Sequence, residues 1–204
     1  MAHLAVLPHI CYPRPMTLFQ NMRRGLFPAR LTVDEIYDLT TAGVLRENER
    51  IELIEGEVVP MAAAKADWHA LMESKLIWGF AQRLPAAVRL YPAPSLTLSA
   101  DTLLEPDLVV LPRGSMIRQM RGPDVLLLIE VADSSLSYDL RVKAPLYARH
   151  GVRDYWVVDA VRQTIRIHRA AENGVYTDVE EYEAHDTVAP LLFPEPTIRL
   201  DTLD

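Results

Sequence analysis

Cysteine is nearly absent from the sequence: Cys11 is the only one among 204 residues. This excludes a disulfide framework and any zinc site built on cysteine ligands. The longest apolar run, residues 125–129, has the length of a strand and falls far short of the roughly 18 residues of a membrane span. The N-terminal residues lack a basic segment, and Pro8 and Pro13 interrupt them, so we expect no signal peptide. A cytoplasmic, soluble protein is the resulting expectation.

The composition favours one well-packed domain. Half of the residues are hydrophobic and 24% are charged, so the chain can bury a core and bulk disorder is excluded. A length of 204 residues suits one domain with a short extension. Residues 1–30 contain four prolines and show no hydrophobic period, which predicts an extended N-terminal arm. Residues 31–204 are predicted to form the domain.

Lysine is also scarce, and the charge is unevenly placed. The net charge of −7 argues weakly against a nucleic-acid-binding protein, but residues 172–204 alone hold nine acids and one arginine. Residues 1–30 hold four arginines and no acid, and the stretch between these segments has 16 basic and 19 acidic residues. A local basic face is therefore not excluded. Only Lys65, Lys75 and Lys143 are lysines, so each of the three is a candidate for a specific role.

Local signals define the first predicted elements. Thr32 and Glu35 have the spacing of a capping box, which predicts a helix that runs to about Ala42 and is ended by Gly43. Glu55-Gly56 predicts the turn of a hairpin between residues 50–54 and 57–61.

Hydrophobic periodicity predicts the remaining elements. The longest helix is expected at residues 66–84, with one apolar stripe formed by Trp68, Leu71, Met72, Leu76, Ile77, Phe80 and Leu84. A second helix is expected at residues 137–150, where Pro145 should kink or shorten it. Strands are expected at residues 88–91, 95–99, 106–111, 125–131, 154–159 and 164–169. This order predicts an α/β fold in which helices pack on a sheet.

Two of the most apolar predicted strands each carry an acid. Asp107 opens the run PDLVVL, and Glu130 lies near the end of VLLLIEV. A buried carboxylate is costly unless it is paired or bound to a cation, and two of them on neighbouring strands suit a hard divalent ion. A structural role is the alternative, with Asp107 capping a turn and Glu130 paired to an arginine.

Lys143 follows Glu130 by thirteen residues, in the second predicted helix. If this helix packs over the strand ends, the ammonium reaches the same pocket, where it orients a water or offsets charge on a phosphate. An ordinary exposed helix lysine is the alternative interpretation.

The order of these segments resembles that of a known family. LTVDEIYDL, RIELIEGEVVPM, His69, EPDLVVLP and LLLIEVADSSLSYDLRVKAPLYARHGVRDYWVVD match the Uma-two family of the PD-(D/E)XK nuclease superfamily over about 170 residues in the right order. The resemblance implies a restriction-endonuclease-like core, a mixed central β-sheet flanked by helices, and an Mg²⁺-dependent (or Mn²⁺-dependent) phosphodiesterase site.

The resemblance also assigns roles to residues. Asp107 and Glu130 match the motif acids that bind the metal, but Ala132 stands where the motif lysine is expected. Lys143 matches a lysine that has migrated to the following helix in some branches. Glu52 matches a recurrent family acid, implied as a third metal ligand, although a solvent-facing strand acid is the alternative. His69 also matches the family pattern and is implied as an auxiliary residue, with a structural histidine as its alternative.

The predicted activity is endonuclease hydrolysis of DNA, in a homodimer whose two sites cut two strands. Phosphate contacts are predicted for Arg113, Arg118 and Arg121, in an acid-free part of the chain between the two site strands, although a solvated loop is the alternative. Two other functions remain open: a nucleic-acid-binding or regulatory module that has lost turnover, and an oligomeric interaction protein whose carboxylates are structural.

Overall fold

The computed structural model describes residues 18–25, 30–46, 49–61, 66–193 and 195–203. Most of the expected N-terminal arm lies outside these residues, and its described part contains a short helix, α1 (Leu18–Arg23). Helix α2 (Val33–Thr41) begins at Thr32 with the predicted capping box, in which the hydroxyl accepts the Glu35 N–H and the Glu35 carboxylate accepts the Thr32 N–H. The capping-box prediction is confirmed.

A small antiparallel sheet follows α2, in the strand order β2-β1-β5-β4. The predicted hairpin is present as β1 (Ile51–Ile54) and β2 (Glu57–Pro60). Its two turn residues, Glu55 and Gly56, have φ values of 50° and 83°, the left-handed conformation that this tight turn requires. Strands β5 (Thr102–Leu104) and β4 (Leu96–Ser99) complete the sheet.

The larger sheet has six strands in the order β10-β9-β8-β7-β6-β3. Strands β7 and β8 are parallel, and the other neighbouring pairs are antiparallel. The sheet is therefore mixed, as predicted. Its strands are β3 (Val88–Pro92), β6 (Leu108–Pro112), β7 (Leu127–Ala132), β8 (Tyr155–Asp159), β9 (Thr164–Glu172) and β10 (Val175–Tyr182).

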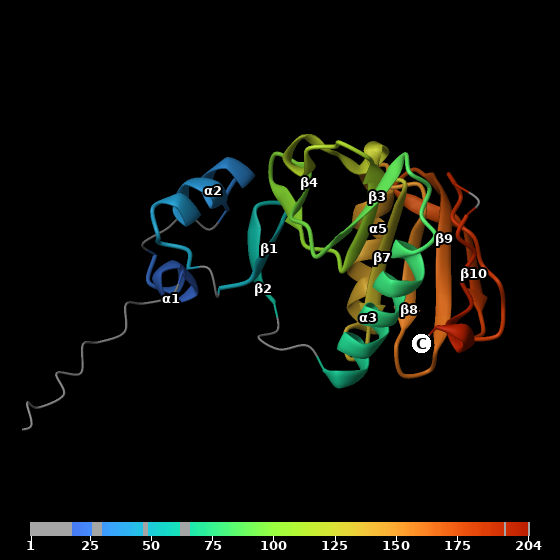
Figure 1. The fold of residues 1–204 in the computed structure, drawn as a ribbon. Coiled ribbons are helices and arrows are strands. Elements are labelled where there is room, and N and C mark those ends of the chain that lie inside the picture. The colour runs from blue at the N-terminus through green and yellow to red at the C-terminus, as the bar shows by residue number, and fades with distance from the viewer. Residues whose placement is uncertain (1–17, 26–29, 47–48, 62–65, 194, 204) are drawn as a thin grey trace, which may run out of the picture.

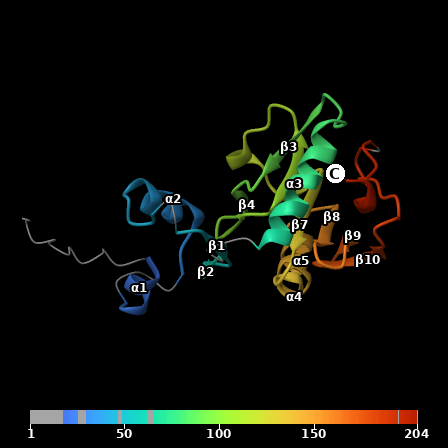
Figure 2. The same ribbon diagram turned by 60° about the horizontal axis from the view of Figure 1, so that its bottom comes forward.

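Helices cover both faces of this sheet (Figures 1 and 2). Alternate residues of the central strands contact α3 (Asp67–Ala81) on one face and α5 (Ala144–Arg149) on the other. Leu127 and Ile129 belong to the core on the α3 face, whereas Leu128 belongs to the core on the α5 face. Because both faces are buried, β7 is apolar along almost its whole length, and Glu130 is an exception that needs partners.

The apolar stripe predicted for the long helix is partly wrong. Met72, Leu76 and Phe80 are buried, but Trp68 is 58% exposed and Leu71 is 49% exposed. Both side chains line a small hollow with Met72, Lys75 and Ala160. Trp78 is likewise 63% exposed.

The second predicted helix is interrupted as Pro145 suggested. It consists of α4 (Leu136–Tyr138), a π-helical turn η3 (Asp139–Lys143) and α5. The N–H of Ala144 bonds to the carbonyl of Asp139, five residues back. Such π-turns accommodate a locally widened backbone and recur at functional sites, and this one buries the side chains of both Asp139 and Lys143.

Three short 3₁₀ turns complete the described elements: η1 (Ile117–Gln119), η2 (Gly122–Asp124) and η4 (Leu200–Thr202). Among the helices of the described ranges, none combines the length and the apolar character that crossing a membrane demands.

Candidate active site

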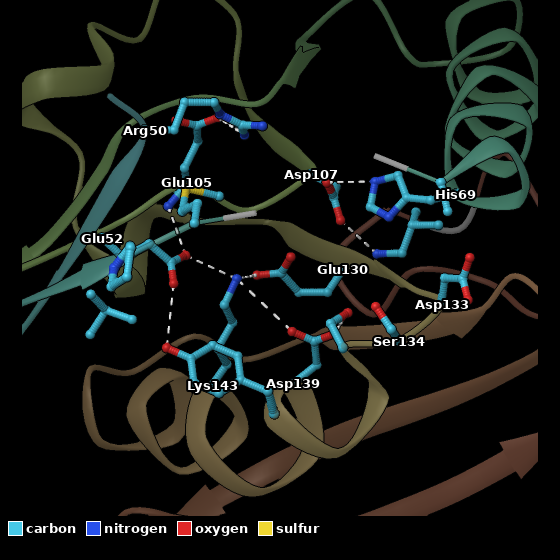
Figure 3. A pocket seen from close by; sticks show the side chains of 17 residues that line it. Arg50, Glu52, His69, Glu105, Asp107, Glu130, Asp133, Ser134, Asp139 and Lys143 are labelled. Carbon is cyan, nitrogen blue, oxygen red and sulfur yellow. Dashed lines mark hydrogen bonds and ion pairs between the residues drawn. The ribbon is translucent and has the colours of Figure 1, made fainter. Parts of the chain in front are cut away.

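A pocket of about 310 Å³ opens where the two sheets and the two helical layers meet. Its walls come from β1, the segment before β6, the end of β7, the start of α3 and the π-turn. Figure 3 shows the acidic and basic side chains of these elements pointing into one space. The lining includes Glu52, His69, Asp107, Glu130 and Lys143, so the structure brings the five central residues named from the sequence to one place.

Asp107 is held by the register of the two central strands. Leu108 of β6 pairs with Ile129 of β7, and one residue further along this antiparallel ladder Asp107 lies across from Glu130. The Asp107 Oδ2 accepts a 2.8 Å hydrogen bond from the N–H of Val131, and its Oδ1 lies 3.0 Å from His69 Nε2. Asp107 is therefore fixed between the β7 backbone and α3, which contradicts the alternative of a simple turn cap.

Glu130 is buried on the α5 face of the sheet and is held by two donors. Its Oε1 accepts a 2.9 Å hydrogen bond from Lys143 Nζ and a 2.7 Å bond from the Tyr147 hydroxyl. Burial raises the pKa of Glu130 to about 8, although the Lys143 charge acts in the opposite direction. The expected structural alternative of an arginine partner is not what is found, because the partner is Lys143.

Glu52 supplies a second carboxylate to the same lysine. Glu52 Oε1 lies 2.9 Å from Lys143 Nζ and also accepts a 3.3 Å hydrogen bond from the Glu105 N–H. Glu52 is 2% exposed, so the alternative of a solvent-facing strand acid is wrong. The side chain points from β1 into the pocket because the hairpin folds over its rim (Figure 3).

The π-turn places Lys143 in the centre of three carboxylates. Besides Glu130 and Glu52, Asp139 Oδ1 lies 4.0 Å from Nζ. Burial alone would lower the pKa of Lys143, but the three carboxylates raise it above its usual range, so the ammonium stays charged. Lys143 is 5% exposed, and the alternative of an exposed helix lysine is therefore wrong.

His69 belongs to a second cluster on the α3 side of the pocket. Its Nε2 lies 3.0 Å from Asp107 and 3.7 Å from Glu73 Oε2, one helical turn along α3. One ligand atom from each of the three residues lies within 4.8 Å of the others. Sequence reasoning missed Glu73, although its i, i+4 spacing from His69 was a usable signal.

Tyr147 and Arg50 were also missed. Tyr147 is fully buried among core residues, and its hydroxyl donates to Glu130. Arg50 lines the pocket and pairs with Glu105 at its rim. Both residues lie close in the sequence to residues named above, Tyr147 four positions after Lys143 and Arg50 two positions before Glu52. A tyrosine and an arginine are ordinary at such places, so neither gave a distinct signal.

The three arginines predicted as phosphate contacts lie away from the pocket lining. The Arg118 guanidinium stacks over the Tyr37 ring, 4.0 Å from its centroid. Arg121 donates to two backbone carbonyls of its own segment, and Arg113 donates to the Ala86 carbonyl. These contacts stabilise the local chain, and the predicted role in phosphate binding stays a prediction.

Comparison with known proteins agrees with this architecture. The model of the Uma2 family, described as "Putative restriction endonuclease", matches residues 33–201. No curated protein matches the chain. A crystal structure described as "a putative nuclease belonging to DUF820 from Anabaena variabilis ATCC 29413" superposes with a TM-score of 0.64 at 18% identity, over 85% of this chain and 97% of that one.

These findings define the class of the protein. The two sheets, the flanking helices and the acidic pocket give a nuclease-like α/β fold. Because the family match spans most of the sequence, the chain belongs to the Uma2 family.

Proposed function

We propose that the protein is a divalent-metal-dependent nuclease that hydrolyses phosphodiester bonds of DNA. The observation that carries this proposal is the convergence of Asp107, Glu130, Glu52 and Lys143 on one pocket, in a chain of the Uma2 family. Oxygen-rich pockets of this kind suit Mg²⁺ or Mn²⁺.

The donor set fits a cation. Lys143 and Tyr147 both donate to Oε1 of Glu130, and in Figure 3 the second oxygen of Glu130 lies on the side of Asp107. Asp107 and Glu130 therefore offer carboxylate oxygens to the same space, and Glu52 lies on the other side of the Lys143 ammonium (Figure 3). A divalent cation bound here would polarise the scissile phosphate and lower the pKa of a bound water.

Lys143 supplies the charged donor. Its ammonium is fixed by two carboxylates at 2.9 Å, so it is oriented before substrate arrives. We assign it the role of the migrated motif lysine, which positions the attacking water and offsets charge that develops on the phosphate. Tyr147 holds the Glu130 carboxylate in place.

One observation favours a second candidate function. The Lys143 ammonium already contacts two of the acids at 2.9 Å, so a cation of the protein itself occupies part of the space between the carboxylates. This favours a module that binds nucleic acid without cleaving it. The two candidates differ in turnover: the module binds DNA or RNA and leaves both intact.

Nicking of supercoiled plasmid and calorimetric titration with Mg²⁺ or Mn²⁺ test the proposal together. For Lys143→Ala we expect metal affinity close to wild type and a rate lower by ~10²–10³, the usual cost of one electrostatic stabiliser. Asp107→Ala is expected to lose metal binding and activity together. Lys75→Ala is the control, because Lys75 donates to the Leu203 carbonyl outside the pocket.

Three outcomes would overturn the proposal or its parts. Wild-type nicking that survives Asp107→Ala and Lys143→Ala would place the activity elsewhere. A Lys143→Ala protein that nicks as fast as wild type would remove the migrated-lysine role. Metal binding without cleavage of any DNA or RNA would favour the non-cleaving module.

A homodimer is proposed from the resemblance to the PD-(D/E)XK nucleases, and sedimentation of the full chain tests it.

A further inference from the structure

We infer that His69, Glu73 and Asp107 form a second cation position, separate from the one between Asp107 and Glu130, and that it selects a first-row transition ion such as Mn²⁺ over Mg²⁺. This inference rests on the proposed function, because it adds a cation to the same pocket. It names Glu73, which neither the motif nor the pocket of the proposed nuclease site includes.

The geometry of the three side chains supports this position. His69 and Glu73 are one turn apart on α3, so the fifteen-residue helix holds them on one side. The His69 Nε2 lies 3.0 Å from Asp107 Oδ1 and 3.7 Å from Glu73 Oε2. Metal–ligand bonds of about 2.0–2.2 Å keep ligand atoms within about 4.4 Å of one another, so the cluster needs little adjustment to close around a cation.

Burial adds to the argument. The side chains of His69 and Glu73 are only 14% and 15% exposed, and Asp107 is more buried still. Water screens charges less in a partly desolvated site, so carboxylates there attract a cation more strongly than exposed ones do. The imidazole nitrogen supplies a third ligand.

The nitrogen ligand determines the kind of cation. Mg²⁺ and Ca²⁺ prefer sites made of oxygen ligands alone, whereas imidazole suits first-row transition ions. The cluster offers one nitrogen and two carboxylates, in contrast to the Asp107, Glu130 and Glu52 set, which offers oxygen only. Asp107 belongs to both sets, as a shared carboxylate does in two-metal sites.

The experiment counts Mn²⁺ bound per full-length chain after dialysis and records pulsed EPR of the bound Mn²⁺. We expect wild type to bind two Mn²⁺ and Glu73→Ala to bind one. The metal affinity of the second position should fall by at least ~10–100-fold, the usual effect of removing a residue that only supports a metal ligand. Nitrogen hyperfine coupling should be present in wild type and absent in His69→Asn. Asp67→Ala is the matched control, because Asp67 is an exposed acid on the same helix.

The outcomes separate this inference from the proposed function. A single Mn²⁺ that persists in Glu73→Ala and disappears in Glu130→Ala would overturn the second position and leave the proposed nuclease site intact. No Mn²⁺ binding by wild type would overturn both. The inference would also be overturned if Asp67→Ala lost the second Mn²⁺ as Glu73→Ala does, or if wild type showed no nitrogen hyperfine coupling. Circular dichroism in EDTA confirms that each variant is folded before its stoichiometry is compared.

Discussion

The ammonium of Lys143 lies 2.9 Å from the carboxylate of Glu130, although one residue comes from the π-turn and the other from the central strand β7. This contact joins the helical layer to the sheet at the pocket. A buried charge that loses its partner is costly, so the pair has consequences for stability as well as for chemistry. The same lysine therefore serves the fold and the proposed reaction.

We predict that Lys143→Met destabilises the metal-free protein by about 3–5 kcal/mol, the usual cost of breaking a buried ion pair from one side. Glu52, Glu130 and Asp139 would remain as neighbouring buried acids without the ammonium. Mn²⁺ should stabilise the variant about as much as it stabilises wild type, because Lys143 is not a metal ligand and the affinity is expected to be similar. Urea unfolding in EDTA and in Mn²⁺ measures both effects.

Lys75→Met serves as the control for that experiment. Lys75 bonds to one backbone carbonyl and has no role in the pocket, so its variant should lose less stability and show no greater response to Mn²⁺ than wild type. Equal losses in the two variants, or a Lys143→Met protein that Mn²⁺ does not stabilise, would contradict the prediction.

Local sequence signals predicted most of the fold. The capping box at Thr32 and the Glu55-Gly56 turn depend on neighbouring residues alone, and both are present. The stripe on the long helix was less accurate because periodicity does not say how wide the covered face is. Trp68 and Leu71 fall just outside the part of α3 that packs on the sheet.

The candidate site was harder to predict in full. Asp107 and Glu130 could be found because acids are conspicuous in apolar strands, and Lys143 because lysines are few. Glu73 and Tyr147 carried no such contrast: a helix acid and an aromatic residue are ordinary in their contexts. For Glu73 the usable signal was its i, i+4 spacing from His69, whereas the role of Tyr147 appears only when packing brings its hydroxyl to Glu130.

Metal affinity should depend on pH through Glu130. Burial raises the pKa of Glu130 to about 8, so below that pH a cation must displace a proton from the carboxylate. We expect affinity to rise about tenfold per pH unit up to about pH 8 and then to level off, as for any ligand that binds in its deprotonated form. Calorimetry in two buffers with different ionisation enthalpies counts the released proton. An affinity that is constant from pH 6 to 8 would contradict this role of Glu130.

A second buried ion pair anchors the C-terminal segment to the sheet. Asp154, whose side chain is fully buried, accepts bonds from Arg169 Nε at 2.8 Å, from Trp156 Nε1 and from the N–H of Leu191. We predict that Arg169→Ala costs about 3–5 kcal/mol, because the buried Asp154 carboxylate loses its ion-pair partner. Denaturant unfolding measures this cost.

Arg166 provides the matched comparison on the same strand. Its pair with Glu181 is partly exposed, with side-chain exposures of 38% and 30%, and ion pairs near the surface contribute about 0–1 kcal/mol. Arg166→Ala should therefore have a small effect. If Arg169→Ala and Arg166→Ala lost similar unfolding free energies, the burial of Asp154 would not determine how much an arginine contributes to stability.

We predict a loss of stability in acid that comes from His168 of β9 and does not involve the pocket. The His168 ring is buried and packs against the rings of Tyr155 and Tyr176. Within the described residues, no hydrogen-bond partner reaches its Nδ1. Burial, the largest cause, lowers the pKa of His168 to about 4. The unfolded chain therefore takes up a proton near pH 6.5 that the folded protein resists, and stability falls as the pH decreases from about 6.5 to about 4.

The total size of this loss is up to about 3 kcal/mol, since each unit of pKa difference corresponds to about 1.4 kcal/mol. His168→Phe keeps an aromatic ring in the same space and removes the titrating group, so its stability should change less over this range while remaining close to wild type at pH 7. His185→Gln is the control, because His185 is exposed and its replacement should leave the profile unchanged. Urea unfolding at intervals between pH 4 and 7 measures all three proteins. If His168→Phe lost as much stability in acid as wild type does, the acid sensitivity would have to come from the buried carboxylates, and the His168 imidazole would have no part in it.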